Sequence, residues 1–293
     1  IQNKIRTSNY ISKSKHNVAH HYDLSDKLYE LFLDPDRQYS CAYFNSPNDT
    51  LEQAQINKKE LISKKLLLEE GQSVLDIGCG WGGMAAHIYK KSNANVVGVT
   101  LSEEQIAYAK QRKINEKLDK VEYRLQDYRN VNETYDRIVS VGMFEHVGTS
   151  HYQEFFNKVH DLLNDTGVAL IHTIGRLTEP TNNDPWIEKY IFPGGYIPAL
   201  SETMSRVEKS GLALTDVQVL RFHYAETLKR WRYNFYDNID KVKELYDEKF
   251  CRMWDFYLSS SQASFEEAGL VVFQLQLSKN KKTVPDKRDY LLA

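Results

Sequence analysis

In the middle of the chain, short apolar runs alternate with segments whose apolar residues recur at helical spacing. Short apolar runs predict buried strands at 74–77, 95–99, 121–125, 136–142 and 167–173. Apolar positions at helical spacing predict helices at 81–91, 102–116 and 151–163. Ser102, with Gln105 three residues later, indicates an N-cap at the start of the second of these helices. Strands separated by helices predict an α/β fold with a mostly parallel sheet and helices on both faces.

The flanking regions differ in pattern from this middle part. Residues 17–33 and 51–69 read as helices, and a Pro/Gly-rich insertion follows residue 176. The remaining sequence predicts a strand at about 213–221, helical sequence from 225 to 265 and a last strand at 270–278. We therefore expect a seven-stranded sheet, helices before it, and a helical insertion before the last strand.

Composition narrows the class of protein. Of the 293 residues, 41% are hydrophobic and 27% charged, as in ordinary globular proteins, and no apolar run is long enough to predict a transmembrane helix. A net charge of −2 argues against nucleic acid as a partner. The three cysteines show neither metal-ligand nor disulfide spacing, so we expect no metal site and a cytoplasmic location. The chain starts at Ile1, so we expect that an upstream segment is missing.

Both ends of the chain are basic. Residues 1–22 hold no acidic residue, and basic residues outnumber acidic ones between 279 and 289. The basic residues of these ends are Lys4, Arg6, Lys13, Lys15, Lys279, Lys281, Lys282, Lys287 and Arg288. Solvated tails and contact with an anionic membrane surface are both compatible with this pattern.

The stretch DIGCGWGG (76–83) directly follows a predicted strand and precedes a predicted helix. Glycines there permit a positive φ and a close approach of the backbone to a ligand, and the helix N-terminus adds partial positive charge. This context favours a nucleotide-like ligand at the C-terminal edge of the sheet. The spacing departs from the dinucleotide fingerprint, and a glycine-rich turn without a ligand is the alternative.

The glycine loop resembles motif I of the class I S-adenosylmethionine (SAM) methyltransferases. Further stretches, together spanning about 16–278, are similar to the cyclopropane-fatty-acid synthases and mycolic acid cyclopropane synthases. These stretches are NVAHHYDL (17–24), FLDP (32–35), QYSCAYF (38–44), LDIGCGWGG (75–83), VVGVTLS (96–102), FEHVG (144–148), LIHTIG (170–175), IFPGG (191–195) and HYAETL (223–228). The resemblance implies a Rossmann-like fold, with 1–70 as a helical cover and basic leader. It also implies a catalytic domain over 71–293 with acyl-chain-binding insertions at about 176–205 and 223–269.

The resemblance also implies which residues bind SAM. They are Tyr39, Ser40, Asp76, Gly78, Cys79, Gly80, Trp81, Gly82, Thr100, Leu101, Gln105, Asp127 and Tyr128. The family's acid at the end of the second strand, which usually holds the ribose, is replaced by Thr100-Leu101-Ser102, and Asp127 would lie by the adenine. Gln105 would reach the ribose in place of the missing acid or, alternatively, only complete the capping box.

In the family that this sequence resembles, the methyl carbon of SAM becomes a methylene bridge across a cis double bond of an acyl chain. A bound bicarbonate is thought to be the general base. The resemblance places Glu145, His172, Tyr224, Cys41 and Ile174 around this anion. Four of these residues have a simpler alternative: Glu145 as a cap of the helix at about 151, His172 as a core histidine, and Cys41 and Tyr224 as packing residues. We expect His146 to be structural and to point elsewhere.

Two family features bear on activity. Family members often carry a cysteine where this sequence has Ser261, and Cys251 is not expected to replace it. Phospholipid-type enzymes carry an additional small N-terminal domain, which this sequence lacks or has lost, and a homodimer would depend on it.

The stretch DPWIEKYIFPGG (184–195) favours unsaturated phospholipid over carrier-bound acyl chains as substrate. This predicts an enzyme attached peripherally to the inner face of the cell membrane. N-methylation of an amine and a non-catalytic SAM- or lipid-binding module are the alternatives.

Overall fold

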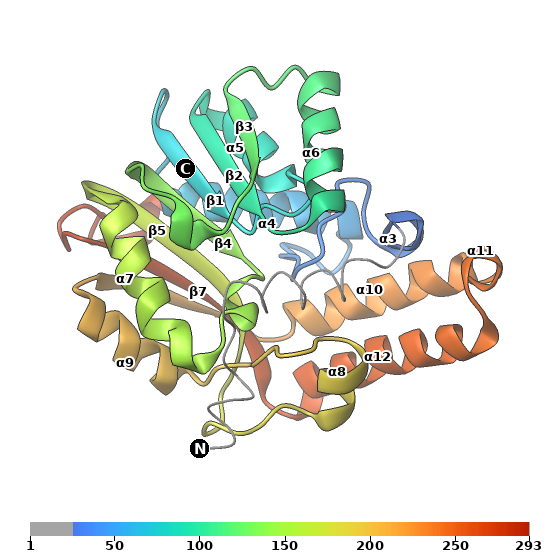
Figure 1. Ribbon diagram of the computed structural model, residues 1–293. Coiled ribbons are helices and arrows are strands. Elements are labelled where there is room, and N and C mark those ends of the chain that lie inside the picture. Colours follow the sequence, from blue (N-terminus) through green and yellow to red (C-terminus); the bar gives the residue numbers. More distant parts are fainter. Residues whose placement is uncertain (1–25, 293) are drawn as a thin grey trace.

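A computed structural model describes residues 26–292 and shows a seven-stranded sheet (Figure 1). The strand order is β3-β2-β1-β4-β5-β7-β6, and β7 runs antiparallel to both of its neighbours. The strands are β1 Ser73–Ile77, β2 Asn95–Thr100, β3 Val121–Leu125, β4 Tyr135–Val141, β5 Leu163–Arg176, β6 Ala213–Leu220 and β7 Leu270–Ser278. This confirms the predicted seven strands and the mostly parallel sheet.

Helices cover both faces of the sheet. In Figure 1, α7 and α9 lie on the near face, while α4 and α5 lie on the far face. The longer helices are α4 Leu51–Leu66, α5 Gly83–Ser92, α6 Glu103–Asn115, α7 Tyr152–Leu162, α9 Leu200–Ser210, α10 His223–Asp237 and α12 Glu248–Glu267. The shorter ones are α3 Asp26–Phe32, α8 Pro185–Tyr190 and α11 Ile239–Leu245, with 3₁₀ turns η1 Tyr128–Asn130, η2 Phe144–His146, η3 Thr149–His151 and η4 Arg288–Leu291.

Three apolar clusters hold these layers together. One packs the side chains of α4, α5 and α6 on the sheet, and a second packs α7 and α9 on its other face. The third lies beyond the C-terminal ends of the parallel strands, where α3, α10 and α12 bury Phe32, Trp231 and Trp254 against one another. This third cluster forms the roof over the strand ends where a ligand is expected.

The structure confirms one predicted helical region and adds two helices that were not predicted. The sequence from 225 to 265 is helical as predicted, and it is divided into α10, α11 and α12. Asn238 leaves helical geometry between the first two, and Asp247 starts α12 by accepting a hydrogen bond from the amide of Phe250. The insertion after 176, for which no helices were predicted, contains α8 and α9. Of the helix predicted at 17–33, only α3 falls within the described residues, and the basic leader at 1–22 lies outside them.

Strand β5 is longer than predicted, and this extension matters for the site. Its pairing with β7 continues to Arg176 opposite Leu270. His172 and Ile174 therefore lie on a regular strand that runs past the end of β4 and under the roof helices. No helix among residues 26–292 is both long and apolar enough to cross a membrane.

Candidate active site

A cavity lies at the C-terminal ends of β1, β2 and β4, and we call it the glycine-loop cavity. Every residue predicted to bind SAM lines it except Gly82. Gly82 has a φ of 85° at the start of α5, and its carbonyl accepts a hydrogen bond of 2.8 Å from the Tyr123 hydroxyl. A Cβ at Gly82 would lie 2.6 Å from that hydroxyl oxygen. Gly82 thus packs against Tyr123 and does not line the cavity, and its contact with SAM stays a prediction.

The glycine loop is held against the neighbouring strand. The amides of Gly78 and Cys79 both donate to the carbonyl of Val99, at 2.9 and 3.0 Å. Gly78 and Gly80 have φ values of 82° and 54°, which a residue with a Cβ adopts only with strain. The sequence thus folds the loop into a turn whose backbone lines the cavity.

Asp76 and Asp127 are buried in the same cavity but differ in their partners. Burial raises the pKa of Asp76 to about 7, and its Oδ2 has no hydrogen-bond partner among the described residues. Asp127 instead accepts hydrogen bonds from the Arg129 guanidinium at 2.9 and 2.7 Å. Asp76 is therefore the acid with free hydrogen-bonding capacity, and contact of Asp127 with an adenine stays a prediction.

Gln105 lines the glycine-loop cavity beside Thr100, and its contact with a ribose stays a prediction. Its Oε1 accepts a hydrogen bond of 2.8 Å from the Thr100 hydroxyl, and both residues line the cavity. Its backbone amide donates to Ser102 Oγ at 3.2 Å. The N-cap is thus confirmed, whereas the Gln105 side chain is bound to Thr100 and does not close a capping box.

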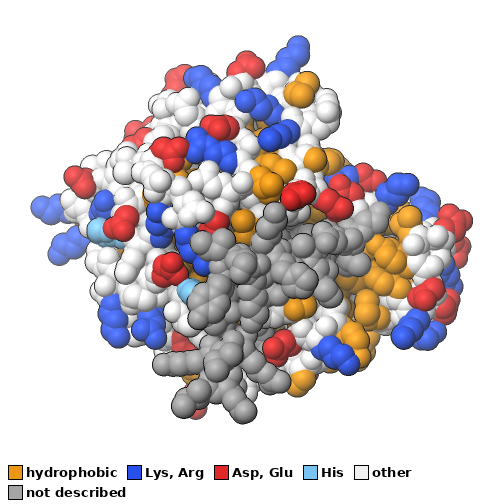
Figure 2. All heavy atoms as spheres, in the orientation of Figure 1, with side chains coloured by type: hydrophobic (Ala, Val, Ile, Leu, Met, Phe, Trp, Pro, Cys, Tyr) orange, Lys and Arg blue, Asp and Glu red, His pale blue; other side chains and the backbone are white. Residues whose placement is uncertain are grey.

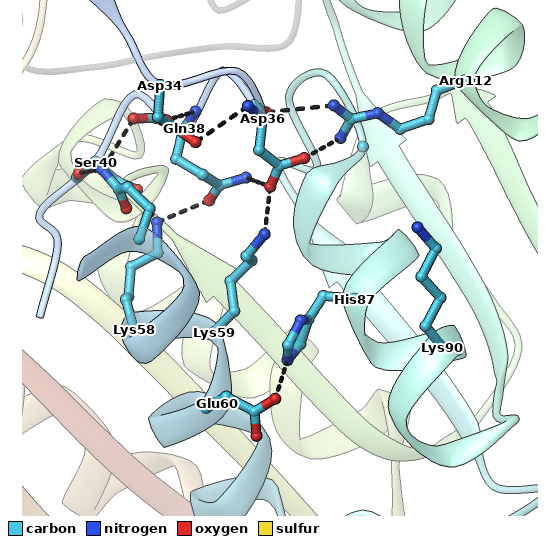
Figure 3. A network of polar contacts seen from close by, with 12 residues as sticks. Asp34, Asp36, Gln38, Ser40, Lys58, Lys59, Glu60, His87, Lys90 and Arg112 are labelled. Atoms are coloured by element: carbon cyan, nitrogen blue, oxygen red, sulfur yellow. Dashed lines mark hydrogen bonds and ion pairs between the residues drawn. The ribbon is translucent and has the colours of Figure 1, made fainter. Parts of the chain in front are cut away.

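Tyr39 and Ser40 belong to a segment between α3 and α4 that is held by buried charges (Figure 3). Lys58 of α4 donates to Gln38 Oε1 at 2.7 Å and to Ser40 Oγ at 2.8 Å. Lys58 is fully buried, and burial lowers its pKa to about 7. Sequence reasoning missed Lys58, although a lysine among the apolar positions of an amphipathic helix was a signal.

The same network anchors Asp36, two residues before Gln38. Its carboxylate lies 2.5 Å from Lys59 Nζ and 2.8 Å from Arg112 Nη1, and these cations keep its pKa below the usual range despite burial. The side-chain nitrogen Nε2 of Gln38 also donates to Asp36 Oδ2. The segment before Tyr39 is thus fixed from both α4 and α6, as Figure 3 shows.

A second cavity, of about 450 Å³, adjoins the first, and we call it the apolar cavity. Its wall is mostly apolar and comes from β5, β7, α8, α10 and α12, including Ile187, Leu228, Phe256 and Val272. All five residues predicted to surround the anion line it, namely Cys41, Glu145, His172, Ile174 and Tyr224. A few polar groups in an otherwise apolar pocket are typical of a ligand site.

Glu145 is held in the wall of the apolar cavity by a short hydrogen bond from a backbone amide of β5. Turn η2 places it after β4, and its Oε1 accepts from the Ile174 amide at 2.6 Å. Its Oε2 is buried without a partner among the described residues, and burial raises its pKa to about 7. The helix-cap alternative is wrong, because α7 starts at Tyr152 after His151. The Ile174 amide, predicted to face the anion, is already engaged by Glu145.

The remaining three residues approach from other elements. His172 Nδ1 lies 3.1 Å from the Gln274 side-chain nitrogen, and its Nε2 is buried without a partner in the described chain. Cys41 donates weakly to the Ala42 carbonyl at 3.3 Å, and burial raises its pKa. Tyr224 of α10 packs edge-on against Trp231 while it lines the cavity. Tyr224 therefore packs against Trp231 and lines the cavity at once, and its contact with an anion stays a prediction.

Comparison with known proteins places the chain in a family. The family model described as mycolic acid cyclopropane synthetase matches residues 10–275. This chain belongs to that family. A cyclopropane-fatty-acyl-phospholipid synthase of Escherichia coli is 41% identical over 259 residues, which is 88% of this chain and 66% of that protein. The chain thus spans about two thirds of the length of this relative.

Solved structures confirm the class I SAM-dependent methyltransferase fold of this family member. The cyclopropane synthase MmaA2 from Mycobacterium tuberculosis is 36% identical, with a TM-score of 0.86 over 90% of this chain and 98% of that one. Mycolic acid cyclopropane synthase CmaA1, complexed with SAH and CTAB, is also 36% identical. Its TM-score is 0.85 over 90% of this chain and 97% of that one.

The structure corrects one further expectation for this family member. His146 was expected to point away from the site, but it lines both cavities. The prediction failed because η2 turns the chain after Met143, so that consecutive side chains face different parts of the same opening.

Ser261 lines the apolar cavity with Ser260, whereas Cys251 is buried elsewhere on α12 and does not line it. This agrees with the expectation that Cys251 is no substitute. Residues 26–292 hold no cluster of three or more metal-ligating side chains.

Proposed function

We propose that this protein transfers a methylene group from SAM across the cis double bond of an unsaturated phospholipid acyl chain, forming a cyclopropane fatty acid. One observation carries the proposal: Tyr39, Ser40, Gly142 and His146 line both cavities. A methyl donor in the glycine-loop cavity and an alkene in the apolar cavity would therefore meet at this shared wall. An alkene is a poor nucleophile, so its reaction with a sulfonium depends on such an alignment.

SAM as the donor is supported by the glycine loop and by the SAH in the related CmaA1 structure. Phospholipid as the acceptor is supported by the similarity to the Escherichia coli cyclopropane-fatty-acyl-phospholipid synthase. The apolar wall, including Leu228 and Val272, suits an acyl chain and excludes water from a carbocation-like intermediate.

The acyl chain would enter past α8 and α12. Trp186 and Phe256 line the apolar cavity and also an outer hollow, whose wall includes Tyr190, Phe250 and Met253. We call these five residues the entrance rim. Phe256 is 52% exposed and Tyr190 45% exposed, and Figure 2 shows hydrophobic side chains gathered on this side of the molecule. An exposed apolar patch at the mouth of an apolar cavity fits docking on a lipid surface, here the inner face of the cell membrane.

The basic C-terminal stretch does not belong to this surface. It follows Ser278, at the opposite end of β7 from Leu270, and a strand of this length spans about 26 Å. Two of its cations, Lys279 and Arg288, pair with Asp165 and Asp216. The docking proposal therefore rests on the entrance rim.

The residues of the apolar cavity fit a small anion. Glu145 Oε2 and His172 Nε2 are buried with unused hydrogen-bonding capacity, which a polar ligand would satisfy. Bicarbonate bound there would supply the base that removes a proton from the transferred methyl group. Glu145, His172, Tyr224 and Cys41 would hold it. With a pKa of about 7, Glu145 can accept or donate a hydrogen bond at neutral pH, so it can adjust to an anion that carries a proton.

Methyl-deuterated SAM provides the test. The protein is incubated with this SAM and with vesicles of a cis-monounsaturated phospholipid, and the fatty acids are analysed by mass spectrometry. We expect a cyclopropane acid that keeps two of the three deuterium atoms, because one is lost when the ring closes. An unmodified lipid together with methylation of an amine panel would contradict the proposal and identify an N-methyltransferase.

A further inference from the structure

Three polar residues lie in a row across the last three strands of the sheet. His172 of β5 is the cross-strand partner of Gln274 of β7, and Gln274 is the partner of Gln218 of β6. Cross-strand partners in register point to the same face of a sheet. Lys65, in the last turn of α4, lies against this row, and both Lys65 and Gln274 are fully buried. Neither has a role in the proposed function as described above.

The hydrogen bonds of this row have only one consistent direction. Lys65 Nζ lies 2.8 Å from Gln274 Oε1 and 2.5 Å from Gln218 Oε1. Burial lowers the pKa of Lys65 to about 8, so it is mostly an ammonium at neutral pH, and an ammonium can only donate. A flipped Gln274 amide would place its NH₂ group against that ammonium, so two donors would face each other and the ammonium would keep only Gln218 Oε1 as an acceptor in this row. The oxygen of Gln274 must therefore face Lys65.

This orientation determines the proton position on His172. With its oxygen on Lys65, Gln274 presents its NH₂ group to His172 Nδ1 at 3.1 Å. Nδ1 must then accept, so the single proton of the neutral ring lies on Nε2. The surroundings also oppose an imidazolium: burial first, and then Lys58 and Lys65, hold the pKa of His172 well below its ordinary value.

We propose that Lys65 and Gln274 are positioning residues that hold His172 as its neutral Nε2–H tautomer. The ring lines the apolar cavity, and Nε2 is the nitrogen without a partner among the described residues. It thus offers a hydrogen-bond donor to the cavity that Glu145 also lines. The other tautomer would present a lone pair there, which would repel an anion. This consequence for the site rests on the proposed function, whereas the tautomer itself does not.

Nuclear magnetic resonance of ¹⁵N-histidine-labelled protein tests the tautomer without any turnover. The His172 signals are assigned by their loss in His172→Gln. In the unmodified protein we expect a protonated Nε2 and a lone-pair-bearing Nδ1, and the ring should stay neutral at a pH where ordinary histidines are protonated. A proton found on Nδ1 would overturn the proposal, and this result needs no variant to fold.

Gln274→Glu tests whether the Gln274 side chain sets the tautomer of His172. The carboxylate has nearly the same size and keeps the contact with Lys65, but it can only accept, so it should draw the proton to Nδ1. We expect the ¹⁵N pattern of His172 to reverse. Cyclopropane formation should fall about 10- to 100-fold, as for lost partners of other functional histidines, with the KM for SAM unchanged. An unchanged tautomer in this variant would contradict the proposal.

Gln218→Glu is the matched control. It places the same charge against the same Lys65 nitrogen without touching His172, so we expect the tautomer and the activity to stay as in the unmodified protein. Reversal in this variant as well would mean that charge near Lys65, and not the contact with Gln274, sets the tautomer. If the protein forms no cyclopropane but the tautomers behave as expected, the proposed function fails and the positioning role stands.

Discussion

Glu145 is a buried carboxyl group that keeps one oxygen without a hydrogen-bond partner among the described residues. A buried carboxylate normally gains several hydrogen bonds, yet only one oxygen of Glu145 has a partner in the described chain. Desolvation therefore raises its pKa to about 7, even though the Ile174 amide acts in the opposite direction. This cost to stability is expected where a group is kept for a ligand.

Glu145→Gln should remove a pH dependence of stability. Between the unfolded pKa of about 4.5 and the folded value of about 7, the folded protein keeps a proton that the unfolded chain has lost. Stability must then decrease as the pH rises through this window, by about 3 kcal/mol at most. Glutamine can still accept from the Ile174 amide, so the variant should fold and lack this decrease. Urea unfolding at a series of pH values measures the free energy of unfolding of both proteins. Parallel pH profiles would contradict the raised pKa of Glu145 as the cause of the decrease.

At the scale of elements, the segment from 34 to 41 depends on α4. It brings Tyr39 and Ser40 to the wall shared by the two cavities, but it has no regular structure of its own. Lys58 supplies two of the hydrogen bonds that hold it, and the Tyr39 hydroxyl lies 2.8 Å from that of Tyr257 in α12. The segment therefore couples α4 to the roof over the site.

Lys58→Met should weaken SAM binding more than folding. The variant fills a similar volume but removes two donors to the segment, so the binding affinity should fall about 10-fold, equivalent to about 1.4 kcal/mol. Titration calorimetry with SAM measures the affinity. Lys64→Met on the same helix is the control, since the Lys64 side chain donates to the Leu291 carbonyl and to no residue of the segment from 34 to 41. Equal affinities of the two variants would show that Lys58 does not position the site.

At the scale of the whole molecule, one edge of the sheet carries both cavities. The strand ends supply the polar groups, and α8, α10 and α12 supply an apolar enclosure that the α/β core alone lacks. Trp186 packs edge-on against Phe256, with 4.6 Å between the ring centroids, and thereby joins the insertion after β5 to the C-terminal helices. The entrance rim is thus built from segments that lie about 70 positions apart in the sequence.

Removing the rim should affect lipid binding and leave SAM binding intact. Trp186→Ala with Phe256→Ala should reduce sedimentation with unsaturated phospholipid vesicles at least 10-fold, because each aromatic ring contributes about 1.5–3 kcal/mol when it is buried in lipid. Tyr233→Ala on α10 is the control, with a side chain of similar exposure, 53%, that lines neither cavity nor the outer hollow. Comparable loss in this control would contradict docking through the rim.

The sequence alone determined the local features of this protein. The seven strands, the glycine loop and the cap at Ser102 follow from short-range hydrophobic periods and backbone preferences, which act within a few residues. The resemblance of its motifs to one family placed Glu145, His172 and Tyr224 in a common site, and the structure gathers them in one cavity.

Only the tertiary structure decided features that depend on distant partners. The break of the C-terminal helical sequence at Asn238, the packing role of Gly82 and the position of His146 between the cavities required the surrounding elements. The same holds for the row from Lys65 through Gln274 to His172. Its members come from α4, β7 and β5, and a hydrogen bond is formed only when the fold brings donor and acceptor within about 3 Å.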